Sequence, residues 1–77
     1  MRPLYTIAND IFYLWKKPSV HAMPYIRAMS ELNKMDDVYI SEDGREIVAR
    51  FLANSSTWRG DDAKRVKAEL KEMLRAV

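Results

Sequence analysis

Residues 4–15 read LYTIANDIFYLW, and this segment predicts an amphipathic helix against which the rest of the chain packs. Pro3 suits an early helical position, where no backbone N–H is needed, and Pro18 stops the helix a few residues after the segment ends. The apolar residues at the three- and four-residue spacing of one helix face are Leu4, Ile7, Ala8, Ile11, Leu14 and Trp15. The pattern therefore predicts a first helix over residues 4–17.

Three further segments show helical signals. Pro24 fits only the first turn of the second helix, and Asp43 with Glu46 forms a capping-box pattern that starts the third. Asp61 and Asp62 favour the first turn of the last helix because its N-terminal end is partially positive. The sequence thus predicts an all-α fold, a compact bundle of four short helices over residues 4–17, 21–33, 43–54 and 58–76.

The connector over residues 34–42 is acidic and is expected to be extended. Its strand-like run, residues 38–40, is too short for an ordinary sheet. We therefore expect a link without a sheet, with Tyr39 or Ile40 packed inward.

Composition limits the chain to one helical domain over residues 1–77. With no cysteine, disulfides and thiolate metal sites are excluded, and a cytoplasmic location is expected. No targeting or membrane-spanning segment is recognised. The net charge of +2 is compatible with binding an anion but is small for a dedicated DNA-binding protein.

Catalysis has little support in the sequence. His21 is the one histidine, and nothing places a serine such as Ser55 or Ser56 beside it as a nucleophile. The acidic residues of the connector lack the spacing of a calcium-binding loop. We expect a protein that is not an enzyme and that holds neither a metal nor a cofactor.

A hydroxyl-rich, cationic segment precedes the last helix. Free N–H groups at a helix N-terminus can hold phosphate, Trp58 could stack on a base, and Arg59 could pair with a phosphate oxygen. The predicted ligand-binding residues are Ser56, Thr57, Trp58, Arg59 and Lys64. The structural alternative is that Ser56 or Thr57 caps the helix, that Trp58 fills the core, and that the neighbouring aspartates repel anions.

The first helix carries more aromatic rings than a chain of 77 residues is expected to bury. Exposed rings favour contact with another protein surface. We therefore predict a homo-oligomer, or an interface with a partner protein, formed by Tyr5, Phe12, Tyr13 and Trp15. The structural alternative is that the bundle covers all four rings.

Direct DNA binding is a weaker alternative. The predicted last helix supplies six cations: Arg59, Lys64, Arg65, Lys67, Lys71 and Arg75. The same helix also carries Asp61, Asp62, Glu69 and Glu72, which would oppose phosphates.

Two stretches, PYIRAM at residues 24–29 and IVARFLANSSTWRGDDAK at residues 47–64, resemble small uncharacterised accessory proteins encoded by tailed phages and prophages. The similarity covers roughly the last two-thirds of the chain. It implies a phage accessory protein in the host cell cytoplasm, and proteins of this size class often counter host defence. It supplies no functional residues to transfer.

In that setting we expect a non-enzymatic counter-defence protein that sequesters an anionic nucleotide second messenger as a homo-oligomer. The alternatives are an inhibitor that binds a host defence protein directly and a small DNA-binding regulator. An inhibitor that imitates DNA is disfavoured, because such proteins are strongly acidic and this chain is not.

Overall fold

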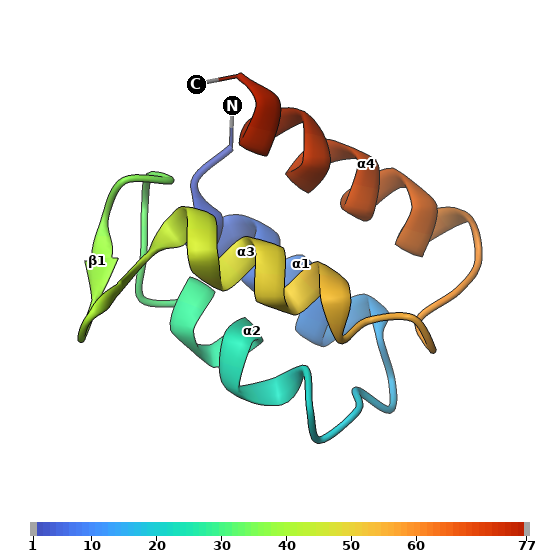
Figure 1. Cartoon of the computed structure of the whole chain (residues 1–77). Coiled ribbons are helices and arrows are strands. Elements are labelled where there is room, and N and C mark those ends of the chain that lie inside the picture. Colours follow the sequence, from blue (N-terminus) through green and yellow to red (C-terminus); the bar gives the residue numbers. More distant parts are fainter. Residues whose placement is uncertain (1, 77) are drawn as a thin grey trace.

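The computed structural model describes residues 2–76, and within them the chain forms helices and one small hairpin (Figure 1). The helices are α1 (Leu4–Leu14), α2 (Met23–Met29), α3 (Gly44–Ala53) and α4 (Asp61–Arg75). The strands β1 (Val38–Tyr39) and β2 (Glu42–Asp43) pair antiparallel. The fold is therefore mostly helical, but the expectation of a purely all-α protein is wrong.

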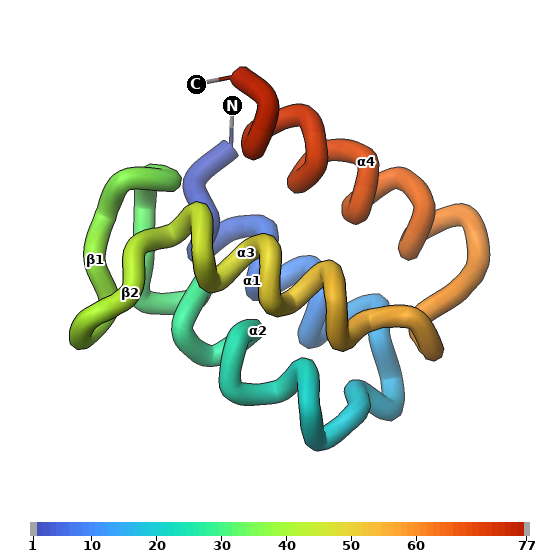
Figure 2. The backbone as a smooth tube through the Cα atoms, in the orientation of Figure 1, coloured from blue at the N-terminus to red at the C-terminus, as the bar shows by residue number. Residues whose placement is uncertain are grey.

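The helices surround one shared core. α2 packs against both α1 and α3, and α4 contacts the same two helices from the other side (Figures 1 and 2). The side chains that meet in the centre recur every three or four residues along each helix, as the sequence predicts. Those that are fully buried include Leu4, Ile7, Ile11, Ile26, Met29, Ile47, Val48, Phe51, Val66 and Leu70.

α1 ends three residues earlier than predicted. Trp15 follows the helix in an extended conformation, with φ −92° and ψ 96°, although its N–H still bonds to the Ile11 carbonyl. Pro18 explains the early end, because a proline disfavours helical geometry in the residue before it and cannot donate to the carbonyl four residues back. The turn directs the Trp15 ring into the core.

α2 is shorter than predicted at both ends. Residues 19–22 form a turn in which the Ser19 hydroxyl accepts a hydrogen bond from the Ala22 N–H at 3.2 Å. Beyond α2, the carbonyls of Leu32 and Asn33 accept the N–H groups of Tyr5 and Leu4 at 2.8 and 2.9 Å. These bonds divert the chain from helical geometry, and they satisfy N–H groups that the start of α1 would leave unpaired.

The last two helices begin close to where capping signals place them. The Asp43 carboxylate accepts the N–H of Glu46 at 3.0 Å, so the predicted cap of α3 is confirmed. α4 begins at Asp61 rather than residue 58, because Gly60 has φ 108° and ψ 179°, a conformation that is almost exclusive to glycine. The Arg45 guanidinium donates to the Leu74 carbonyl at 3.0 Å and ties the start of α3 to the end of α4.

The connector forms a hairpin, contrary to the prediction that it contains no sheet. Tyr39 lies opposite Glu42, and the turn exposes 87% of Ile40, which adopts φ 61°. Tyr39 packs partly against the core, so the expectation that Tyr39 or Ile40 packs inward is met by Tyr39. The Gly44 N–H, just after β2, donates to the Asp37 carbonyl, just before β1, at 2.9 Å. This bond holds the two strands together at the open end of the hairpin.

An ion-pair cluster joins the start of the chain to α4. The Arg2 guanidinium donates to both carboxylate oxygens of Glu69, at 2.9 and 2.6 Å, and also pairs with Asp10 of α1. The Arg2 hydrogen bonds lower the pKa of the Glu69 carboxyl. Because a bidentate guanidinium–carboxylate pair fixes orientation, this cluster helps to set α4 against α1.

Candidate functional site

The ring of Trp58 lies in the core and not on the surface. It stacks on Trp15 with 5.5 Å between centroids and 10° between ring planes, and both rings meet the edge of Phe51 at 6.4 Å. Only 5% of Trp58 is exposed. The prediction that Trp58 stacks on a ligand base is therefore wrong, because both of its sides are occupied by the protein.

Trp15 is only 6% exposed, so its predicted interface role is also wrong. The other three predicted interface residues remain on the surface, with 45% of Tyr5, 40% of Phe12 and 77% of Tyr13 exposed. They lie on the side of α1 that faces away from the core, and we call them the α1 aromatic face. The Lys16 ammonium lies over the Tyr13 ring, 5.6 Å from its centroid, and adds a positive charge beside the α1 aromatic face.

The remaining predicted ligand residues, Ser56, Thr57, Arg59 and Lys64, are exposed around the start of α4. The N-terminus of α4 has no side-chain cap, and Asp61 and Asp62 occupy its first turn. These carboxylates disfavour an anion on the helix axis. The predicted residues thus surround the helix start without forming a pocket with Trp58.

Lys67 holds the segment between α3 and α4 in place. Its ammonium donates to the carbonyls of Ser55 and Trp58 at 2.6 and 2.7 Å and lies 5.9 Å from the Trp58 ring centroid. Burial lowers the pKa of Lys67, and the nearby charges of Lys71 and Arg59 lower it further. The sequence shows Lys67 only as one cation among several, and no local signal marks it as a partner of these carbonyls.

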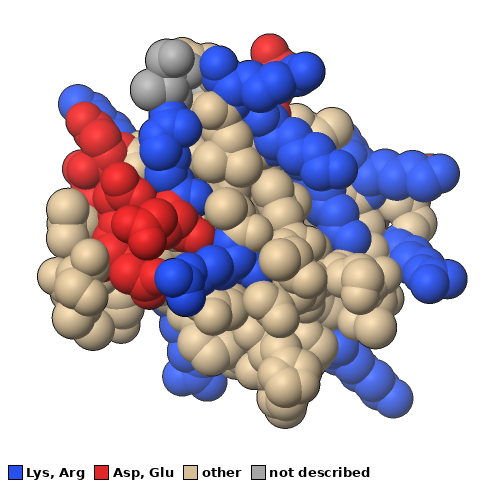
Figure 3. Space-filling model, in the orientation of Figure 1, with Lys and Arg blue, Asp and Glu red and all other residues tan. Residues whose placement is uncertain are grey.

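Cations gather along one flank of α4 and in the segment just before it, and we call Arg59, Lys64, Lys67, Lys71 and Arg75 the α4 basic stripe. Figure 3 shows lysine and arginine side chains over α4, while acidic side chains cluster at the left, on the side of the hairpin. Within residues 2–76, no ion pair forms at Arg59, Lys64 or Lys71. These three positive charges are therefore available to an external anion.

The spacing of the stripe opposes helix stability. Lys67 and Lys71 are four residues apart, as are Lys71 and Arg75, and like charges at this spacing destabilise a helix by about 0.2–0.5 kcal/mol per pair. No acidic residue lies three or four positions from Lys71 along α4, so none relieves this repulsion at Lys71. Lys67, Lys71 and Arg75 therefore form a run of like charges on one side of α4.

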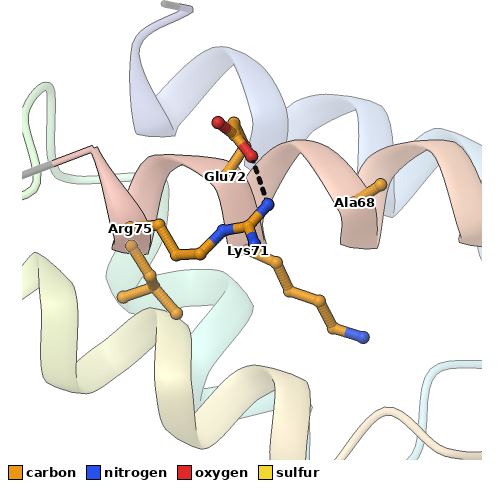
Figure 4. A pocket seen from close by; sticks show the side chains of 5 residues that line it. Ala68, Lys71, Glu72 and Arg75 are labelled. Atoms are coloured by element: carbon orange, nitrogen blue, oxygen red, sulfur yellow. Dashed lines mark hydrogen bonds and ion pairs between the residues drawn. The ribbon is translucent and has the colours of Figure 1, made fainter.

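An open hollow of about 550 Å³ adjoins the C-terminal half of the stripe. Its lining residues all belong to α4: Ala68, Lys71, Glu72, Leu74 and Arg75 (Figure 4). Arg75 donates to Glu72 at 2.6 Å, whereas the Lys71 side chain extends away from both. A second hollow of about 280 Å³, lined by residues that include Arg2, Lys34 and Met73, lies where the N-terminal segment meets the connector.

The residues considered for catalysis are not brought together as a reactive site. His21 is exposed on the turn before α2. Ser55 is buried, and its hydroxyl donates to the Leu52 carbonyl at 3.1 Å. Across residues 2–76, no group of three or more His, Cys, Asp and Glu side chains is arranged to hold a metal ion. In the same part of the chain, no helix combines the length and apolarity needed to cross a membrane.

Comparisons with known proteins add no family to this picture. No family model matches the chain, and neither the curated proteins nor the solved structures contain a match. The resemblance to phage accessory proteins stays a prediction, and the functional argument rests on the α4 basic stripe and the α1 aromatic face.

Proposed function

We propose that this chain is a non-enzymatic phage accessory protein that binds a phosphate-bearing ligand on the α4 basic stripe and works as a homo-oligomer. The observation that carries the proposal is that, among residues 2–76, Lys64 and Lys71 on α4 and Arg59 just before it form no ion pair. This moves the predicted anion site from the start of α4 to its flank. Ser56 and Thr57 are not needed there, and Trp58 supports the site from the core.

The electrostatics of the cluster favour an anion. Burial lowers the pKa of Lys67, and the positive charges of Lys71 and Arg59 lower it further, so both charges act on the same ammonium. A phosphate placed against them relieves their mutual repulsion and forms charge-assisted hydrogen bonds. Lys67 contributes positive potential while its ammonium keeps its two carbonyl partners.

We expect inorganic tripolyphosphate to bind the protein in 50 mM salt. The paired substitution Lys64→Gln and Lys71→Gln should weaken binding roughly tenfold, because two charge-assisted contacts are lost. Isothermal titration calorimetry measures the change. The matched control is Arg27→Gln with Lys34→Gln, which removes the same net charge from exposed positions outside α4. Absence of binding to the unaltered protein, or equal losses in both paired variants, would contradict the proposal.

The oligomer is assigned to the α1 aromatic face. Phe12 and Tyr13 are consecutive residues of α1, and both are exposed. A contact between two copies through this face would bury the rings by an isologous interface. The α4 basic stripe would remain accessible to ligand.

The paired substitution Phe12→Ser and Tyr13→Ser is expected to convert the oligomer to monomer, because it removes most of the exposed ring area of α1. Size-exclusion chromatography with light scattering gives the mass. Val20→Ser serves as the control, since it alters a residue that is 79% exposed outside α1. A monomeric unaltered protein, or an oligomer that survives the paired substitution, would show that this face does not form the contact.

A further inference from the structure

We infer that the α4 basic stripe binds the phosphate backbone of duplex DNA without reading its base sequence. The inference rests on the proposed function, because it names the class of phosphate-bearing ligand that this stripe takes. It differs from the nucleotide signal expected from the sequence, and the shape of the stripe is the reason.

The stripe is a row of charges and not a cup. From Lys64 to Arg75 it follows α4 for about 16 Å at the helical rise of 1.5 Å per residue. A single nucleotide would reach only part of this row, whereas a nucleic acid presents a phosphate repeatedly along its length. Cations spread along an axis thus fit an extended polyanion.

The surface beside the stripe is open. The lining residues of the adjoining hollow that the structure describes all belong to α4, so within residues 2–76 no second element lines it. Sites for small molecules usually bury most of the ligand between several elements. An open, cationic flank instead matches a ligand that is held by its backbone while its bases point elsewhere.

The absence of a nearby stacking surface favours a duplex over a single strand. Proteins that hold single strands stack bases on exposed aromatic rings. Within residues 2–76, the ring nearest the stripe in sequence is Trp58, and it is enclosed by Trp15 and Phe51. The exposed aromatic rings Tyr5, Phe12 and Tyr13 belong to α1 instead.

The acidic residues of α4 are placed so that they interfere little. Asp62 pairs with Arg65 at 3.5 Å, Glu69 with Arg2 at 2.6 Å, and Glu72 with Arg75 at 2.6 Å. Asp61, at the first position of α4, lies three residues before Lys64 and opposes a phosphate only at that end. Among the residues that the structure describes, Lys71 has no ion-pair partner, so its charge remains for the ligand.

The test is fluorescence anisotropy of a labelled 20-base-pair DNA duplex, measured from 50 to 200 mM salt. The three unpaired cations predict a slope of about −3 for log affinity against log salt concentration, at about −0.9 per phosphate contact. Lys64→Gln with Lys71→Gln should bring the slope to about −1, because each lost phosphate contact removes about one unit. Arg27→Gln with Lys34→Gln should leave the slope at about −3, and a duplex of scrambled sequence should bind equally well.

The outcomes separate this inference from the proposed function. If tripolyphosphate binds at the stripe but the duplex does not bind, the ligand is a small anion. The same conclusion follows if the duplex binds with a salt slope near −1. In both cases the inference is overturned while the proposed function stands. If neither probe binds, both fail. Equal slope changes in the two paired variants would also overturn the inference, since overall charge and not the stripe would then govern binding.

Discussion

Replacing Trp58 with alanine is expected to lower the free energy of unfolding by about 3–5 kcal/mol, the range observed when large aromatic side chains are removed from cores. The ring is covered by Trp15 on one side and meets Phe51 at its edge, so the substitution leaves a cavity that two other rings line. A domain of this size holds only about 5–15 kcal/mol in total. The variant should therefore be marginally folded at 25 °C.

Urea unfolding followed by far-ultraviolet circular dichroism measures this loss without relying on the fluorescence of the altered residue. Trp58→Phe is the matched variant, because it keeps an aromatic ring in the cluster and should lose much less stability. It should also bind tripolyphosphate as well as the unaltered protein does. A stable Trp58→Ala variant that had lost only ligand binding would show instead that Trp58 acts as a ligand platform.

The inner faces of the helices could be predicted from sequence because burial follows helical periodicity. Ile7 and Ile11 of α1, and Val66 and Leu70 of α4, are all fully buried as their spacing indicates. The cap of α3 could also be predicted, because an aspartate three residues before a glutamate can accept the backbone N–H of that glutamate without any distant contact. Local signals of this kind do not depend on what the rest of the chain does.

The errors arose where distant contacts override a local pattern. Trp15 and Trp58 are 43 positions apart, and nothing in either segment reveals that the two rings stack. The hairpin likewise depends on a bond from Gly44 to Asp37 that closes a short loop. The role of Lys67 could not be predicted either, because its two carbonyl partners lie in the segment between α3 and α4, whose path no local pattern indicates.

The two functional surfaces differ in how far the sequence anticipates them. An excess of aromatic residues in the first helix already indicated exposed rings, and three of the four are exposed. The α4 basic stripe was obscured by the acidic residues of the same helix, which appear interspersed when read in order. In the structure Glu69 and Glu72 are turned to partners of their own, and the unpaired lysines remain.

Gly44→Ala is expected to lower the free energy of unfolding by about 2 kcal/mol, as overpacking of a tight contact does. Helix propensity alone predicts the opposite sign, because alanine is favoured over glycine inside a helix by about 1 kcal/mol. The packing decides the sign. An added Cβ would lie 2.8 Å from the Met35 carbonyl oxygen and 2.9 Å from the Leu4 side chain, and the backbone carbonyl cannot move aside without displacing the connector.

The same substitution should have a local signature. The Arg45 N–H donates to the Met35 carbonyl at 3.0 Å, so moving that carbonyl would lengthen the bond that holds the connector against α3. Hydrogen exchange at the amides of residues 44 and 45 should accelerate by more than at Val66, in the centre of α4. A glycine can be required because space is short or because its φ is positive, and Gly60→Ala tests the second cause alone. Nothing lies within 4 Å of a Cβ added at residue 60, so the stability lost there comes only from φ 108°. A Gly44→Ala protein as stable as the original would mean that the connector yields freely, and the hairpin would then be a loosely held appendage and not part of the packed fold.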